Sequence, residues 1–154
     1  MLRCLQRKWS LVAKATVKLP EDMLKRMSKL GSNMDKVAKA VLTAGGEVVF
    51  SKAQSNLKAV IGSNTAFESR STGELEDSFG VSDVLLDKNG NYNIKIGFSE
   101  PRSDGGSNAK IANIIEYGKS GQPAKPFLKP AQRATKKACI DTMKSTFESE
   151  VEKL

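Results

Sequence analysis

The chain has 154 residues, 39% of them hydrophobic and 27% charged, with a formal net charge of +8. This length suits one core, so we expect residues 1–154 to form a single domain. The composition excludes a disordered or membrane-spanning chain, and the lack of histidine excludes a serine triad and the usual zinc ligand sets.

Residues 1–19 are predicted to form a terminal strand or arm. Trp9 to Leu19 partly alternates and carries β-branched residues, which favours an edge strand ended by Pro20. The uncharged stretch Trp9 to Ala13 is too short for a signal peptide, so we expect a cytoplasmic chain. A short helix should follow from Pro20 to Gly31, with Glu21 and Asp22 in its first turn.

A long second helix is predicted from Ser32 to about Ile61, because its apolar residues recur with helical spacing. Ser32 or Asn33 could cap it. The central pair Gly45-Gly46 costs about 1 kcal/mol per glycine relative to alanine. The pair therefore indicates either a close helix crossing or bend, or a weakness that the fold tolerates.

The middle of the chain is predicted to contain a loop, a short helix and a β-hairpin. Residues 62–73 are loop-like, and S-T-G-E predicts a capping box between Ser71 and Glu74. F-G-V-S-D-V-L-L and Y-N-I-K-I-G-F then read as two strands. Asn89-Gly90 between them is typical of a type I′ hairpin turn.

The last third begins with a polar loop, residues 99–108, which we expect to be mobile. Residues 109–118 are apolar but do not distinguish helix from strand. A final helix is predicted from Pro126 nearly to the end, on the apolar residues Phe127, Leu128, Ala131, Ala134, Ala138, Cys139, Met143, Phe147, Val151 and Leu154. The order indicates an α+β fold with long helices packed on a small antiparallel sheet.

Groups that could carry chemistry are sparse. Glu74, Glu76 and Asp77 could be paired carboxylates or a cation site, but acids are favoured at a helix start for dipole reasons. Glu116 is either solvated or bound to a nearby amide or cation. Cys4 and Cys139 lie far apart without metal spacing, so no disulfide is expected. We predict no catalytic residue, cofactor or metal.

The charge is unevenly distributed along the chain. Residues 1–60 carry twelve basic and four acidic side chains (+8), residues 61–100 three and seven (−4), and residues 101–154 ten and six (+4). Complementary patches between copies of the chain would explain this pattern. A basic nucleic-acid-binding module is the alternative function. Its candidate contacts are Lys8, Lys14, Lys18, Lys25, Arg26 and Lys29.

Four motifs occur in a fixed order: S-T-G-E-L-E-D-S-F, the hairpin, A-x-x-x-E-Y-G, and P-F-L-x-P-A at the last helix. In this order, across residues 30–150, the chain resembles the tail-completion or minor tail component family of long-tailed bacteriophages. The matching positions are Thr72, Gly73, Leu75, Ser78, Glu116, Gly118, Pro126, Phe127, Pro130 and Ala131. Two departures are Ile111 before Ala112, where the family often has an aromatic residue, and the lack of a proline just before Thr72.

The resemblance implies a non-enzymatic phage or prophage protein that forms a six-fold ring at the neck of the virion. Such a ring would bind head-side connector proteins and tail tube or tail terminator proteins, and DNA would pass through it without specific binding. We expect the polar loop to contact these partners. Its candidate residues are Pro101, Arg102, Asp104, Gly105 and Gly106.

Overall fold

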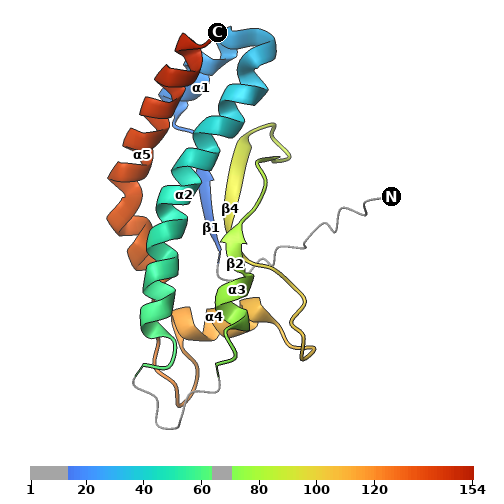
Figure 1. The fold of residues 1–154 in the computed structure, drawn as a ribbon, viewed down its shortest axis with the longest axis vertical. Helices are drawn as coiled ribbons and strands as arrows, with labels where there is room; N and C mark the ends of the chain where they lie inside the picture. Colours follow the sequence, from blue (N-terminus) through green and yellow to red (C-terminus); the bar gives the residue numbers. More distant parts are fainter. Residues whose placement is uncertain (1–13, 64–70) are drawn as a thin grey trace.

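The computed structural model describes residues 14–63 and 71–154, and it confirms an α+β fold (Figure 1). In chain order the elements are β1 (Ala15–Lys18), α1 (Glu21–Met27), the 3₁₀ helix η1 (Ser28–Asn33), α2 (Met34–Val60), α3 (Glu74–Ser78), β2 (Phe79–Val81), β3 (Leu85–Leu86), β4 (Tyr92–Phe98), α4 (Asn108–Tyr117) and α5 (Leu128–Glu152). Two long helices lie side by side, a small sheet packs on one of them, and short helices lie at both ends, α1 and η1 at one and α3 and α4 at the other.

The sheet is antiparallel and is organised around β4. On one side β4 pairs with β1, and on the other it pairs with β2 at one end and β3 at the other. The β4 residues Ile94, Ile96 and Phe98 alternate toward the helix layer and are at most 2% exposed. The strand predicted over residues 79–86 is divided in two, because Ser82 at the break bonds to both backbone groups of Lys95.

Helix α2 lies between α5 and the sheet, and its two central glycines face these two layers. A Cβ on Gly45 would lie 2.6 Å from Met143 Cγ of α5, whereas one on Gly46 would lie 3.2 Å from Ile94 of β4. The Cys139 thiol also reaches the Gly45 carbonyl oxygen at 3.3 Å. The glycine pair therefore marks a close crossing. This confirms the first of the two interpretations given above, rather than a weakness that the fold tolerates.

The apolar stripe of α5 repeats every four residues. Ala131, Thr135, Cys139, Met143 and Phe147 are all buried. The prediction was wrong for three other positions: Ala134 and Ala138 are exposed, and Leu154 is 55% exposed. A strict four-residue spacing suits one narrow contact with α2, so alanines on the flanks of the stripe stay outside it.

The β3–β4 hairpin is confirmed, but its turn is not type I′. The Gly90 amide donates to the Asp87 carbonyl at 3.0 Å, so Lys88 and Asn89 are the central residues of the turn. Gly90 follows with φ 78°, and Asp87 N donates to Asn91 O at 2.9 Å. This is a three-residue loop with glycine in the left-handed position. The Asp87 carboxylate accepts the amides of Asn89 and Asn91 and stabilises it.

At the N-terminal end, the edge strand is confirmed over Ala15–Lys18. Lys14 and Leu19 flank it without joining it, and residues 9–13 of the predicted strand lie outside the described residues. Helix α1 begins after Pro20, and η1 then contains a non-helical Gly31 before α2. The predicted cap of α2 is not made, since Asn33 precedes the helix without a side-chain cap bond. Within residues 14–63 and 71–154, no helix combines the length and apolarity that crossing a membrane requires.

Candidate functional site

The predicted motifs come together at one end of the molecule. There, α3, α4 and the start of α5 surround the C-terminal end of α2 (Figure 1). We call this region the motif end and define it as residues 71–81 and 97–131. The hairpin turn lies at the other end of β4. Segments that are far apart in sequence, such as those of Phe79 and Phe127, are thus neighbours here.

The central contact of the motif end is made by Glu116. Its carboxylate is only 2% exposed and accepts three backbone amides, from Phe127 and Leu128 at 2.8 and 2.9 Å and from Lys129 at 2.9 Å. These amides belong to the start of α5, where backbone donors have no helical partner and the helix dipole favours a negative charge. Of the two predicted states for Glu116, the structure shows the one bound to amides. The E-Y-G and P-F-L-x-P-A motifs are therefore one unit.

The turn after Glu116 depends on Gly118, which has φ 77° and ψ 176°. This conformation is open almost only to glycine. A Cβ there would also lie 2.8 Å from Ala124 N and 2.9 Å from Gln122 O. The insert folds back on itself, since Lys119 and Gln122 exchange backbone bonds and Lys125 N donates to Ile115 O at 2.7 Å. The backbone thus returns directly to the Glu116 carboxylate.

Phe127 anchors the start of α5 in the core, as predicted. Its side chain is fully buried, and its ring meets Phe79 and Phe98 edge-on at centroid distances of 6.2 and 6.1 Å. The Phe127 carbonyl accepts the Asn56 side-chain amide of α2 at 3.0 Å. The sequence analysis missed Asn56, which carries no local signal of this contact. Pro130 lies in the first turn of α5, where no helical hydrogen bond is lost.

The T-G-x-L-x-x-S element forms α3, but the predicted capping box is absent. The N-cap of α3 is Gly73, with φ 82°, and no side chain caps it. Leu75 is buried, Ser78 Oγ donates to the Leu75 carbonyl at 2.9 Å, and Ser99 N donates to the Ser78 carbonyl at 2.8 Å. Thr72 is exposed, and nothing in the described structure explains its identity.

Glu74 binds the polar loop instead of capping α3. Its carboxylate accepts the Ser103 amide at 2.6 Å and the Ser103 hydroxyl at 2.7 Å, and Arg102 Nη2 lies 3.7 Å away. These hydrogen bonds, followed by the charge of Arg102, lower the pKa of Glu74. Arg102 also donates to Asn108 Oδ1 at 3.1 Å, so its guanidinium is used within the loop.

Both ends of the loop are therefore restrained. Glu100 accepts the Ser107 hydroxyl and the Ala109 amide, both at 2.8 Å, at the start of α4. Asp104 accepts the Gly106 amide at 2.9 Å and pairs with Arg102, and these contacts lower its pKa. The exposed tip comprises Pro101, Ser103, Asp104, Gly105 and Gly106. That this tip is mobile until a partner binds stays a prediction.

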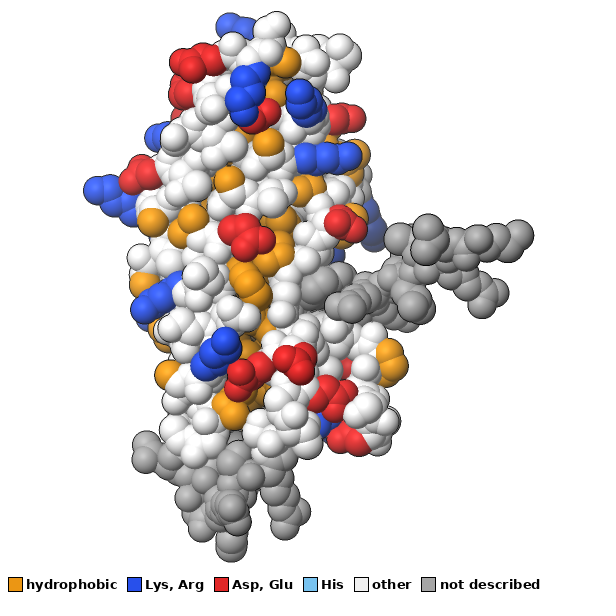
Figure 2. Space-filling view, viewed as in Figure 1, with side chains coloured by type: hydrophobic (Ala, Val, Ile, Leu, Met, Phe, Trp, Pro, Cys, Tyr) orange, Lys and Arg blue, Asp and Glu red, His pale blue; other side chains and the backbone are white. Residues whose placement is uncertain are grey.

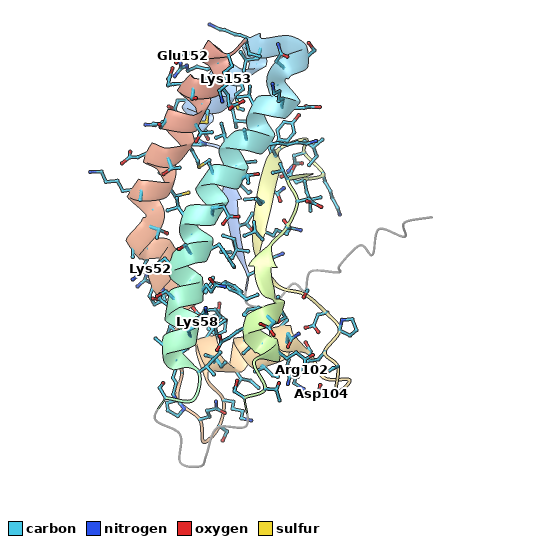
Figure 3. All side chains as sticks on the ribbon, viewed as in Figure 1. Lys52, Lys58, Arg102, Asp104, Glu152 and Lys153 are labelled. Atoms are coloured by element: carbon cyan, nitrogen blue, oxygen red, sulfur yellow. The ribbon has the colours of Figure 1, made fainter. Side chains whose placement is uncertain are left out.

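Acidic side chains gather on one part of the motif end, over α3 and the polar loop. Figure 2 shows Asp and Glu side chains gathered over the region of α3 and the loop, and Figure 3 places Arg102 and Asp104 beside them. The acidic residues of these segments are Glu74, Glu76, Asp77, Glu100 and Asp104. Among residues 14–63 and 71–154, no three Cys, Asp or Glu side chains are grouped so that they could hold a metal ion.

Among the basic residues proposed for nucleic-acid binding, Arg26 is already engaged within the chain. Its guanidinium pairs with Glu148 at 2.7 Å and lies 4.7 Å from the centre of the Phe147 ring. Lys18, Lys25 and Lys29 are exposed, and Lys8 lies outside the described residues.

Cys139 is a free, buried thiol of the α2–α5 contact, and burial raises its pKa.

Comparison with known families gives a match over residues 21–118, with a family described as "Bacteriophage HK97-gp10, putative tail-component". This match covers more than half of the chain, so the chain belongs to the HK97-gp10-like family. It is therefore a structural phage protein, a tail component of the virion that associates with other virion proteins. The match ends at Gly118, so α5 and P-F-L-x-P-A lie beyond it. No curated protein and no solved structure matches the chain.

Proposed function

We propose that the chain is a tail-completion subunit, which forms a ring at the neck of a phage or prophage virion and joins the tail to the head. Membership of the HK97-gp10-like family supports the assignment of the chain to the phage tail. The observation that carries the finer proposal is the Glu116 junction, which ties α4 to the start of α5 through three backbone hydrogen bonds. Fixed angles between elements favour a closed ring, because small angular errors in each copy would prevent closure.

The proposed action is geometric and non-enzymatic. Six copies surround the path of the DNA, which passes without specific binding. The exposed loop tip, with Pro101, Asp104, Gly105 and Gly106, contacts head-side connector proteins or the tail tube and tail terminator. Arg102 holds the loop against Glu74 and Asn108, and its contact with a partner stays a prediction.

A phage whose copy of this gene carries an early stop codon tests the proposal. We expect DNA-filled heads and full-length tails that do not join, seen by electron microscopy of the lysate. Adding the purified protein to that lysate should restore infectious particles. Missing tails, or tails of altered length, would contradict the proposal and indicate a part in building the tail itself.

We also expect the isolated chain to be a monomer or weakly associated, and to close into a ring only on its head or tail partner. Subunit contacts that are charged and modest in area bind weakly on their own. A template that already orients the subunits strengthens their association, because less orientational entropy is then lost. Light scattering at micromolar concentration measures this. A stable hexamer would refute the templating but support the ring, whereas a dimer that binds DNA in a steeply salt-dependent way would favour the nucleic-acid-binding alternative.

A further inference from the structure

An apolar groove lies between the edge strand β1 and helix α5. Its volume is about 310 Å³, and its lining includes Val17, Val49, Cys139, Ile140 and Met143. Lys18 and Lys136 are also part of its lining and are exposed. On the outer side of α5, Arg133, Lys137 and Asp141 adjoin Ile140. The groove therefore has an apolar floor and a rim on which basic side chains outnumber the single acid.

The opposite edge of the same sheet carries the matching features. Leu85 and Leu86 of β3 are 43% and 60% exposed, as few large apolar side chains are among residues 14–63 and 71–154. Asp83 precedes them and is exposed, and Asp87 follows them. The segment S-D-V-L-L-D thus presents apolar side chains between two acids. We call residues 82–87 the leucine arm.

The groove and the leucine arm lie at the same level on opposite sides of β4. Lys18 and Leu85 are both paired with Asn93 in the ladder, one from each side. Leu86 is paired with Tyr92 and Val17 with Ile94, so both side chains point to the helix face of the sheet. A closed ring needs two complementary patches on opposite sides of each subunit and at the same level along the ring axis. An offset between the patches along that axis would generate an open helical filament of subunits.

We propose that the leucine arm of one copy occupies the β1–α5 groove of the next copy, head to tail around the ring. Leu86 contacts Val17 and Ile140 of the neighbour, and Asp83 lies beside its Lys136. This proposal rests on the ring of the proposed function and names its subunit contact. Opposite charge and apolar surface coincide at both patches, which selects a second copy as the occupant.

Disulfide trapping in assembled particles tests the contact. Leu86→Cys and Ile140→Cys are combined in a Cys139→Ser background, in which the serine can still donate to the Gly45 carbonyl. Mild oxidation of purified virions should give a ladder of cross-linked oligomers up to the full ring. Leu86→Cys with Ala138→Cys is the matched control, because Ala138 is exposed on the other flank of the buried α5 stripe. This pair should give no ladder.

The outcomes separate the contact from the proposed function. Joined, infectious particles that contain the protein but show no Leu86–Ile140 ladder would overturn the contact and leave the neck function standing. A disulfide from Ile140→Cys to Cys4 of the same chain would also overturn it, because the occupant would then be the chain's own N-terminal segment. Particles without the protein at the neck would refute the proposed function instead.

A charge exchange gives a second measurement. Asp83→Lys should lower the yield of the ladder roughly tenfold, which corresponds to about 1.4 kcal/mol of association free energy. Adding Lys136→Glu to the same chain should restore the yield to within about threefold, because the inverted pair attracts again. Equal losses in the single and double variants would contradict the pairing of these two residues.

Discussion

The α2–α5 contact and the motif end are both buried, yet they are determined by different kinds of residue. The α2–α5 contact is a matter of shape: Gly45 leaves room for Met143 and Cys139, and apolar side chains of suitable size fill the remainder. At the motif end, the Glu116 carboxylate meets three particular backbone amides, and Gly118 has a conformation that other residues avoid.

This difference explains where the recognisable motifs lie. A shape contact accepts many apolar combinations of equal volume, so it leaves only a periodic pattern in a sequence. A carboxylate that satisfies buried amides accepts almost no substitute, so it leaves a fixed residue at a fixed position. The substitutions below compare these two regions, from the largest expected effect to the smallest.

Phe127→Ala should have the largest effect, because it removes the buried aromatic anchor of the motif end. Its fully buried ring packs on Phe79 and Phe98, and its amide binds Glu116. We expect the free energy of unfolding to fall by about 3–5 kcal/mol, the usual result of truncating a core aromatic. Chemical denaturation measures it. An unchanged midpoint would show that the ring is exposed in solution.

Gly118→Ala should destabilise the chain by about 3 kcal/mol, from backbone strain together with the close contact of a Cβ with the insert. Gly121→Ala is the matched control. Gly121 has a similar φ of 76°, but nothing lies within 4 Å of its Cβ position. The control should change stability by only about 1 kcal/mol. Equal losses in thermal denaturation would mean that φ alone matters and that the packing of the insert does not.

Glu116→Gln tests the motif end without changing its volume. A glutamine keeps one acceptor oxygen but brings an N–H₂ group against amides that also donate. We expect a loss of about 2–3 kcal/mol, in the range for hydrogen bonds to a charged group. Slow hydrogen exchange at Phe127, Leu128 and Lys129 should also be lost. Exchange rates equal to those of the unaltered protein would show that the carboxylate is not the acceptor.

Gly45→Ala tests the shape contact. The added methyl group meets Met143 Cγ at 2.6 Å, but alanine also gains helix propensity. Because these two effects oppose each other, we expect the free energy of unfolding to fall by about 1–2 kcal/mol. In Gly45→Ala with Met143→Ala, the combined loss should be smaller than the sum of the two single losses, because the smaller side chain accommodates the methyl. Additive losses would contradict a direct contact.

The smallest effect concerns the polar loop at low pH. Hydrogen bonds from Ser103 lower the pKa of Glu74 below its ordinary value of 4.5. A carboxyl whose pKa is lower in the folded state stabilises that state above its unfolded pKa, and the contribution is lost as the pH falls through the folded pKa. We therefore expect the Ser103 amide to exchange faster, relative to its intrinsic rate, at pH 3 than at pH 6. Protection in Glu74→Gln should already be low at pH 6.

The sequence by itself determined the elements whose causes are local. Apolar spacing predicted α2 and α5, Asn89-Gly90 predicted the hairpin, and the order of short motifs indicated the phage family. Even the glycine pair of α2 suggested a close crossing. The helices, the hairpin turn and each single motif follow from residues within a few positions of one another, where periodicity and backbone preferences act directly.

Tertiary structure decided which group each polar side chain binds. Glu74 has the spacing of a capping box with Ser71, yet its carboxylate binds Ser103, twenty-nine positions away. Glu116 has no local partner, and its three amides come from a segment that begins eleven positions later in the chain. Ala134 and Ala138 fit the apolar pattern of α5, but α2 covers only a narrow stripe of that helix. A local pattern cannot specify these contacts, because a buried polar group binds whichever donor the fold brings within reach.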